Sequence, residues 1–226
     1  MGCMLESDVS RGGTSSEACY EERTISAFER ELPFNYLDFT TVANAVKSHT
    51  VGELTSTSEL KVAWTALGIA TDPNLELFAG LFHNSDGKVS RRTLLLGILL
   101  IAEVSAQVKA EWLFDSSSSA ATMTKTEVET LIQQIISVSC EALPKLATGD
   151  SPDHLAPSQV NAYLAPVWQA QSSLVEQLSS WLLTGPEVLR SDFILRMCNP
   201  RGACSALLTS SGTRTVCIRL LASHSN

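Results

Sequence analysis

The sequence contains no hydrophobic run long enough to cross a membrane. Its longest apolar stretch, from Leu94 to Ala102, includes Gly97 and is far shorter than the roughly 20 residues of a transmembrane helix. The chain does not open with a basic segment followed by an apolar stretch, so no secretory signal is evident. Its six cysteines lack the spacing of metal ligands, and we interpret them as reduced thiols. These absences predict a cytosolic protein.

Catalytic motifs are also missing. The chain has no HExxH, GxSxG, phosphate-binding P-loop or CxxC pattern. Its histidines occur singly, in polar or loop-like segments, at His49, His83, His154 and His224. Cys140 stands among apolar residues of a predicted helix, where a core position is expected rather than a nucleophile. We therefore predict that the protein is not an enzyme.

Positive charge is scarce. The chain has 16 lysines and arginines against 24 aspartates and glutamates, which gives a formal net charge of -8 and a pI of about 5.0. No basic stripe of the kind that contacts phosphates is visible, so nucleic acid is excluded as an expected partner. The 226 residues, 44% of them hydrophobic, suffice for one large or two small globular domains.

Helical periodicity dominates the chain. Between residues 25 and 197, about eight segments repeat apolar residues at three- and four-residue spacing, as in Val104, Val108 and Trp112. Sustained strand-type alternation is absent, so the predicted fold class is all-α. The predicted parts are a mobile N-terminal arm at 1–22, helical pairs at 23–105 and 106–198, a polar linker at 147–157 and a tail of uncertain structure at 199–226.

One loop has the outline of a calcium-binding loop. Gly87 takes the position of the turn glycine, and Val89 takes the aliphatic position two residues later. Asn84 and Asp86 fall on two of the positions that supply oxygen ligands. These two residues are therefore candidate metal ligands.

The same loop lacks its other important ligands. Phe82 falls on the first position, and Thr93 replaces the bidentate glutamate at the last. Because calcium needs roughly six to eight oxygens, this loop is not expected to bind it tightly. The cofactor prediction is none, or weakly bound calcium.

Three weaker copies of this unit are present. The first, around Val51–Thr55, has no usable ligands. The third places Asp115 and Glu127 near the two ends of a loop that lacks the turn glycine, and these residues form a second candidate metal site. In the fourth, Val188–Ile194 matches a short β-bridge and its exiting helix, but Trp181 occupies the first ligand position.

The spacing of these units over Leu37 to Met197 resembles the EF-hand superfamily, in the paired layout of neuronal calcium sensors and calcineurin B-like proteins. The most specific part runs from Val89 to Val128, across the exit from the second unit and the entry into the third. The resemblance implies EF-hand-like helical pairs with largely lost calcium ligands and a groove for an amphipathic partner helix. An unrelated helical bundle is the alternative interpretation.

A weaker resemblance is to the N-terminal helical region of TLDc-domain proteins, some of which start with Met-Gly and carry EF-hand-like helices. This chain ends without an evident TLDc domain. At the C-terminal end, Thr213–Leu221 is expected to be one short strand or part of a tail.

The first residues partly match an acylation signal. Gly2 is a candidate for myristoylation and Cys3 for palmitoylation. The pattern prefers serine or threonine at position 6, where this chain has Glu6, with Ser7 one place late. Because one myristoyl chain binds membranes only marginally, stable peripheral attachment requires the Cys3 acyl chain as well.

The functional prediction is a non-enzymatic adaptor that binds a protein partner. The four tryptophans lie on amphipathic segments and are expected in the core, with Trp64 and Trp112 as candidates for lining a partner groove. Two alternatives remain open. One is a weak calcium sensor that uses loop 82–93 or 115–127, and the other is the N-terminal fragment of a larger TLDc-type multidomain protein.

Overall fold

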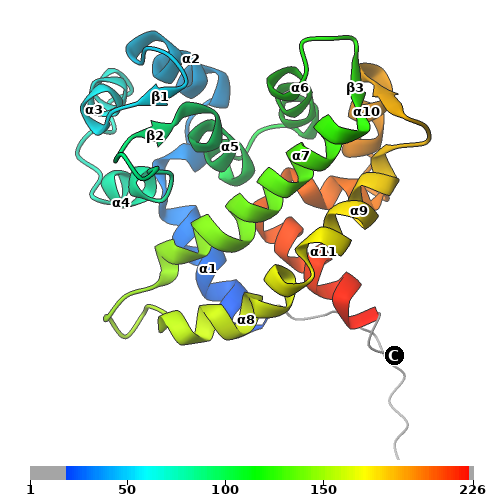
Figure 1. Ribbon diagram of the computed structural model, residues 1–226. Helices are drawn as coiled ribbons and strands as arrows, with labels where there is room; N and C mark the ends of the chain where they lie inside the picture. The colour runs from blue at the N-terminus through cyan, green and yellow to red at the C-terminus, as the bar shows by residue number, and fades with distance from the viewer. Residues whose placement is uncertain (1–18, 224–226) are drawn as a thin grey trace, which may run out of the picture.

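The computed structural model describes residues 19–223, which fold mainly as helices (Figure 1). The predicted all-α class is confirmed, with two small sheets added. The helices are α1 (Tyr20–Glu31), α2 (Phe39–His49), α3 (Thr57–Ala66), α4 (Asn74–Gly80), α5 (Arg91–Ile101), α6 (Ala106–Ser117), α7 (Lys125–Ser137), α8 (Pro157–Gln169), α9 (Gln171–Leu182), α10 (Arg190–Cys198) and α11 (Ser210–Ser223). Short helical turns lie at η1 (Pro33–Asn35), η2 (Val138–Ala142), η3 (Leu143–Ala147) and η4 (Ala203–Leu208).

The predicted acylation sites Gly2 and Cys3 lie outside the described residues, as does most of the predicted N-terminal arm. Helix α1 already begins at Tyr20, inside the predicted bounds of that arm. Within residues 19–223, no helix has both the length and the apolar content to cross a membrane.

A helix, a short strand and a second helix follow one another four times along the chain. The strands are β1 (Leu54–Thr55), β2 (Val89–Ser90), β3 (Thr122–Thr124) and β4 (Glu187–Leu189). Strand β1 pairs antiparallel with β2, and β3 pairs antiparallel with β4. Each sheet joins two units into one lobe, the N-lobe from α2 to α5 and the C-lobe from α6, α7, α9 and α10 (Figure 1).

Buried side chains meet across both sheets. Thr55 lies opposite Val89 in the N-lobe, and Met123 lies opposite Val188 in the C-lobe. All four are buried, so each sheet contributes side chains to the core of its lobe.

Hydroxyl side chains begin three of the helices that follow these strands. Ser56 and Thr124 form capping boxes with Glu59 and Glu127, and the hydroxyl of Ser90 caps α5. Such a cap satisfies backbone N–H groups that have no partner within the helix, and typically contributes about 1 kcal/mol. The local sequence therefore explains why each strand turns directly into a helix.

The two lobes share one hydrophobic core with α5 at its centre. Every residue of α5 from Leu94 to Ile101 is buried. In the N-lobe, the ring of Phe34 lies 5.5 Å from that of Trp64 and 5.1 Å from that of Phe78, measured between ring centroids. The core therefore continues from one lobe to the other without a separate interface.

The strand or tail expected at Thr213–Leu221 is wrong, because this segment lies within helix α11. Residues 203–208 before it form η4. The buried face of α11 contains Thr213, Arg214, Val216 and Cys217 at helical spacing. Two of these four buried residues are polar. The apolar repeat of α11 is therefore weak in the sequence, although this face of the helix is buried.

The predicted polar linker connects η3 to α8 and is attached to the core in its second half. Leu155 is fully buried, and its N–H donates to the carbonyl oxygen of Ala147 at 2.7 Å. Helix α8 then begins with Pro157, a residue favoured in the first turn of a helix.

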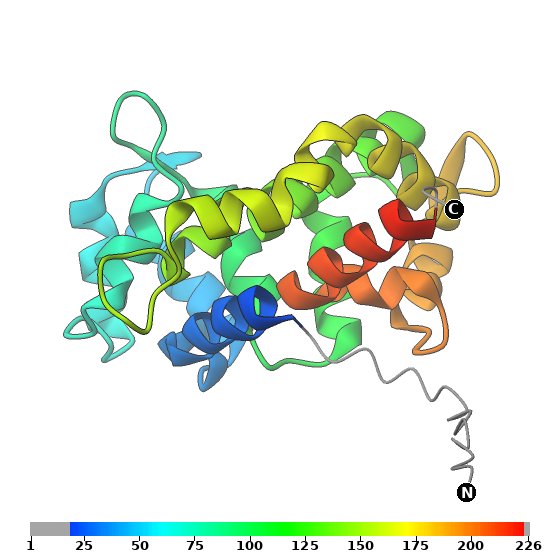
Figure 2. The ribbon, with the colours of Figure 1, turned by 90° about the horizontal axis from the view of Figure 1, so that it is seen from below.

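A buried arginine joins the two ends of the described chain. Arg214 on α11 has an exposed fraction of 0% and lies against α1, as Figure 2 shows for the two helices. Its Nε and Nη2 donate to the two carboxylate oxygens of Glu22 at 2.7 and 2.9 Å. Its Nη1 and Nη2 donate to the carboxylate of Glu29 at 2.7 and 3.1 Å, and Nη1 also donates to the carbonyl oxygen of Ser139 at 3.0 Å. All five N–H donors of the guanidinium are therefore used.

Neighbouring hydroxyls complete this cluster. Glu22 also accepts from the Ser26 hydroxyl at 2.9 Å and from the Tyr163 hydroxyl at 3.0 Å. Glu29 accepts from the Ser210 hydroxyl at 2.7 Å. The cluster thus connects α1, α8 and α11, and the carbonyl of Ser139 adds η2.

Glu22 and Arg214 keep their charges at neutral pH. Burial of the Glu22 carboxyl raises its pKa, whereas the hydrogen bonds and positive charge of Arg214 lower it. Together the lowering effects outweigh that of burial, so the pKa lies below its usual value. Burial also opposes the charged form of Arg214, yet the two carboxylates raise the pKa of the guanidinium above its usual value. Because the folded-state pKa of Glu22 is depressed, its contribution to stability is present at neutral pH and is lost as acid protonates it.

Replacing Arg214 with methionine is expected to lower the free energy of unfolding by about 3–5 kcal/mol, because two buried carboxylates lose their counterion. Urea denaturation followed by circular dichroism measures this change. Arg219→Met, at an exposed position of the same helix, is the control and is expected to change stability by less than about 0.5 kcal/mol. Equal, small effects of both substitutions would show that the cluster does not hold α11 in place.

Candidate functional site

The loop with the calcium-binding outline is closed by its own backbone. The side-chain oxygen of Asn84 accepts from the N–H groups of Asp86 and Lys88 at 3.0 and 2.9 Å. The backbone N–H of Asn84 in turn donates to the carbonyl oxygen of Lys88 at 2.8 Å, and Gly87 adopts a φ of 68°. The two candidate ligands Asn84 and Asp86 therefore lie in one tight turn, where the Asn84 oxygen already has two donors.

The residue at the first ligand position belongs to the core. Phe82 is buried, and its ring lies against Gly97 of α5 and near Phe78, with 5.2 Å between the ring centroids. A Cβ atom added at Gly97 would lie 2.5 Å from Cζ of Phe82. Phe82 therefore anchors this loop to α5 by packing, at the position where a calcium loop has a carboxylate.

The second pair of candidate ligands, Asp115 and Glu127, is not brought together, because each residue binds a different partner. Asp115, near the end of α6, accepts two hydrogen bonds from Arg190, at 2.8 Å from Nε and 3.0 Å from Nη2. Glu127 accepts from the backbone N–H and the hydroxyl of Thr124, at 2.7 and 2.8 Å, as part of a helix cap. The Arg190 hydrogen bonds lower the pKa of the Asp115 carboxyl, and those from Thr124 lower the pKa of Glu127.

The N-lobe has an arginine contact in the corresponding place. Arg91 follows β2 as Arg190 follows β4, and its Nη2 lies 3.4 Å from a carboxylate oxygen of Glu53. The backbone N–H of Arg91 also donates to the carbonyl oxygen of Glu53 at 2.9 Å. In both lobes, therefore, an arginine after the second strand forms an ion pair with an acidic residue of the partner unit.

No group of three or more histidine, cysteine, aspartate or glutamate side chains suitable for a metal ion occurs within residues 19–223. The structure brings Asn84 and Asp86 together, but it places Asp115 and Glu127 in separate contacts. The four candidate ligands are thus parts of turns, caps and an ion pair.

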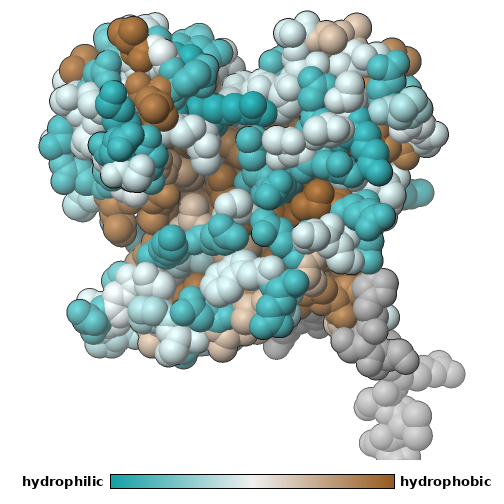
Figure 3. All heavy atoms as spheres, in the orientation of Figure 1, coloured by the Kyte–Doolittle hydropathy of each residue, from teal (hydrophilic) through white to brown (hydrophobic). Residues whose placement is uncertain are grey.

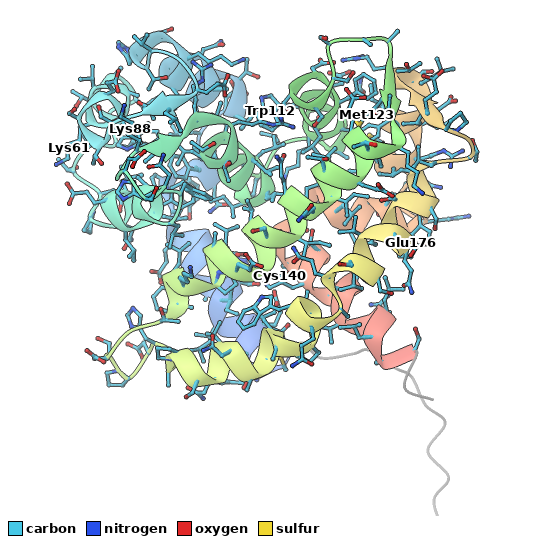
Figure 4. All side chains as sticks on the ribbon, in the orientation of Figure 1. Lys61, Lys88, Trp112, Met123, Cys140 and Glu176 are labelled. Atoms are coloured by element: carbon cyan, nitrogen blue, oxygen red, sulfur yellow. The ribbon has the colours of Figure 1, made fainter. Side chains whose placement is uncertain are left out.

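The two candidate groove tryptophans have different environments. Trp64 has an exposed fraction of 3% and packs in the core of the N-lobe. Trp112 is only partly buried, and its ring meets Phe39 edge-on with 5.6 Å between the centroids. Figure 4 places Trp112 between the two lobes. Of these two tryptophans, only Trp112 therefore exposes part of its side chain to solvent.

Trp112 lines a cavity of about 220 Å³, which we call the interlobe cleft. Leu95 adds apolar surface, and Lys47, Arg91 and Arg92 add positive charge. Figure 3 shows the notch between the lobes, with hydrophilic side chains gathered along it. The cleft also contains the acidic members of the two arginine ion pairs, Glu53 and Asp115.

Not all of this positive charge is neutralised. Arg91 pairs with Glu53, whereas the guanidinium of Arg92 donates to the hydroxyl of Ser117 at 3.1 Å. Among residues 19–223, Lys47 and Arg92 have no carboxylate partner. The cleft therefore combines an aromatic ring with two uncompensated cations.

A buried lysine lies at a second cavity, which the sequence did not predict. Lys109 of α6 is buried and lines a cavity of about 320 Å³ near α1 and the start of α11. Its Nζ donates to the carbonyl oxygen of Leu208 at 3.0 Å. Burial lowers the pKa of Lys109 to about 8, although Glu103 acts in the opposite direction.

No protein-family model matches the chain, and no curated protein resembles it at a significant level. The resemblance to EF-hand proteins therefore stays a prediction. Function is inferred below from the chemistry of the chain itself.

Gly97→Ala is expected to lower the free energy of unfolding by about 1–3 kcal/mol, because the new methyl group overlaps the Phe82 ring. Gly80→Ala, on α4, is the matched control, since nothing lies within 4 Å of its added Cβ. This control is expected to be neutral or to stabilise by up to about 1 kcal/mol. Thermal melts of both variants test whether Phe82 is a core residue, and equal effects would contradict it.

The free energy of unfolding is expected to depend on Lys109 at alkaline pH. The pKa of Lys109 is about 8 in the folded protein and about 10.4 in an unfolded chain. Between these two pH values the unfolded state binds more protons than the folded state, so the free energy of unfolding rises with pH. Between about pH 7.5 and 9.5, the wild type should gain about 2 kcal/mol more than Lys109→Met. Urea denaturation at the two pH values measures the difference, and parallel profiles would contradict the assignment.

Proposed function

We propose that the protein is a non-enzymatic adaptor built on EF-hand-like pairs, which keeps its shape without calcium and binds a helical partner. The proposal is supported by four helix–strand–helix units that join in two antiparallel pairs. This arrangement is what the EF-hand resemblance implies. The loops between the helices use their polar side chains for caps, turns and ion pairs.

The ion pair between Arg190 and Asp115 is the observation that carries the proposal. In a calcium loop, a dissociable metal ion neutralises the carboxylates. Here a guanidinium on the chain itself occupies both oxygens of Asp115 and links the third unit to the fourth. Because this cation is part of the chain, Asp115 has a positive partner without a bound calcium ion, and the pairing of the two units does not require one.

Three thiols, those of Cys140, Cys198 and Cys204, are poor candidates for nucleophilic catalysis. A hydrogen bond with Cys217 and burial raise the pKa of Cys140, and burial raises the pKa values of Cys198 and Cys204. A raised pKa keeps a thiol protonated at neutral pH, whereas the thiolate is the nucleophile. This chemistry supports a binding role rather than a catalytic one.

The interlobe cleft is the proposed partner site. Tryptophan is enriched among residues that dominate binding energy, and Trp112 presents part of its ring beside Leu95. Lys47 and Arg92 favour a partner with negative charge beside its apolar face. An amphipathic helix with acidic residues fits these requirements.

Peripheral attachment to a membrane is part of the same proposal. It depends on acylation of Gly2 and Cys3, which lie outside the described residues. Two acyl chains are needed for stable attachment, since one myristoyl group binds only marginally. The helices of residues 19–223 would then remain at the membrane surface.

Calorimetric titration tests both parts of the proposal. With calcium up to millimolar concentration, we expect no saturable heat and no change in tryptophan emission. With a synthetic amphipathic helix whose polar face is acidic, we expect saturable binding in the presence of EDTA. Lys47→Ala should weaken this binding by about tenfold, because the charge contact is lost.

Exposed Lys88→Ala, in the loop before β2, is the control and should leave peptide binding unchanged. A saturable calcium site with an emission shift would contradict the adaptor and favour a sensor. Peptide binding that is insensitive to Lys47→Ala would exclude the interlobe cleft as the site.

A further inference from the structure

The C-terminal part of the chain has an excess of positive charge. From residue 190 to the end, the sequence has five arginines and one aspartate, with no lysine or glutamate, in a chain whose formal net charge is -8. The five arginines are Arg190, Arg196, Arg201, Arg214 and Arg219. The role of each one can be assigned from its contacts.

Three of these arginines have structural partners. Arg214 is buried between two glutamates, and Arg190 pairs with Asp115. Arg196 donates from Nη1 to the carbonyl oxygen of Trp181 at 3.1 Å. These contacts leave two arginines whose charge is not used to hold the fold.

The remaining two, Arg201 and Arg219, line the same cavity. It has a volume of about 490 Å³ and lies between the turn that follows α10, η4 and α11. Within residues 19–223, neither arginine forms an ion pair, and no aspartate or glutamate lines the cavity. Both side chains are exposed, so a ligand can reach them from solvent.

Small and hydroxyl-bearing residues, together with Pro200 and Val216, form the rest of the wall. Gly202 and Gly212 have no side chains to fill the cavity, and Ser205 and Thr215 contribute hydroxyl groups to its wall. Gly212 is also required for packing, because an added Cβ would lie 2.4 Å from the carbonyl oxygen of Ala206. This close approach packs α11, which carries Arg219, against η4, which begins two residues after Arg201.

We infer that this cavity, here called the C-terminal arginine pocket, binds a phosphate group. The planar guanidinium offers paired N–H donors that match phosphate oxygens, and charge-assisted hydrogen bonds of this kind are among the strongest in proteins. The lining has two arginines and no carboxylate, so no acidic side chain of the cavity competes with an anion for the guanidinium groups. The volume of about 490 Å³ accommodates a diphosphate or the headgroup of an anionic phospholipid.

Pyrophosphate is the probe for the phosphate chemistry, used with the full chain at fixed ionic strength. We expect saturable chemical-shift changes at the amides of Gly202 and Gly212, and a dissociation constant in the millimolar range or tighter. Arg201→Ala combined with Arg219→Ala should weaken binding by at least about tenfold. Replacing both residues by lysine should give an intermediate loss, since lysine keeps the charge but lacks the planar fork.

The matched control removes two exposed lysines of other elements, Lys88→Ala with Lys145→Ala, and should leave pyrophosphate binding unchanged. Because Arg201 and Arg219 are exposed, their variants are expected to stay folded, which a thermal melt verifies. Absence of saturable shifts, or equal binding by the arginine double variant, would overturn the inference.

Vesicles separate the two sources of the phosphate group. One set contains phosphatidylcholine alone, and the other adds phosphatidylinositol bisphosphate. Binding only to the second set, in competition with pyrophosphate and lost in the arginine double variant, would assign the pocket to a lipid headgroup. Pyrophosphate binding with no vesicle binding would assign it to a soluble phosphate compound. Vesicle binding that is neither reduced by pyrophosphate nor lost in the arginine double variant would overturn the assignment of this pocket.

Discussion

The guanidinium of Arg214 is the group on which the arrangement of both chain ends depends. Removing a cation and two carboxylates from water costs several kcal/mol for each ion, and this cost is offset only when every donor and acceptor has a partner. Here all five N–H donors are used, and the partners come from α1 and η2. Few other relative positions of α1 and α11 would satisfy these requirements. The cluster therefore defines where α11 lies, and with α11 it places the cavity beside Lys109 and the C-terminal arginine pocket.

Arginine–carboxylate pairing recurs at the surface with a different role. The Arg190–Asp115 pair is largely exposed, so solvent screens it and it contributes little to stability. The buried strand residues Met123 and Val188 hold the paired units together. The ion pair changes the chemistry of the loop, because Asp115 is paired with a cation of the chain itself. The proposed adaptor rests on this pairing, because a calcium-dependent switch needs carboxylates that are free until the ion arrives.

The helical class and the short strand at Val188 could be predicted because they depend on local periodicity and on the outline of a repeated unit. Helix α11 was missed because its buried face includes Thr213 and Arg214, which hide the apolar repeat. The contact between Glu22 and Arg214 joins residues 192 positions apart, and no local pattern indicates such a pair. Sequence also could not distinguish Trp64 from Trp112, since both occupy apolar positions of helices and only packing decides which one reaches the cleft. The sequence makes Asp115 a candidate metal ligand, whereas the fold places it near the end of α6 and pairs it with Arg190 of the fourth unit.

Native-state hydrogen exchange tests most directly whether the buried cluster makes the two chain ends one cooperative unit. Amides of α1, η2 and α11 would be followed in increasing, sub-denaturing urea. If Arg214 joins these helices, their slowest amides should converge on one opening free energy, equal to that of global unfolding. If α11 instead opens at a lower free energy while α1 and η2 stay protected, the cluster does not couple the two ends of the described chain, and the central role assigned to it here is contradicted.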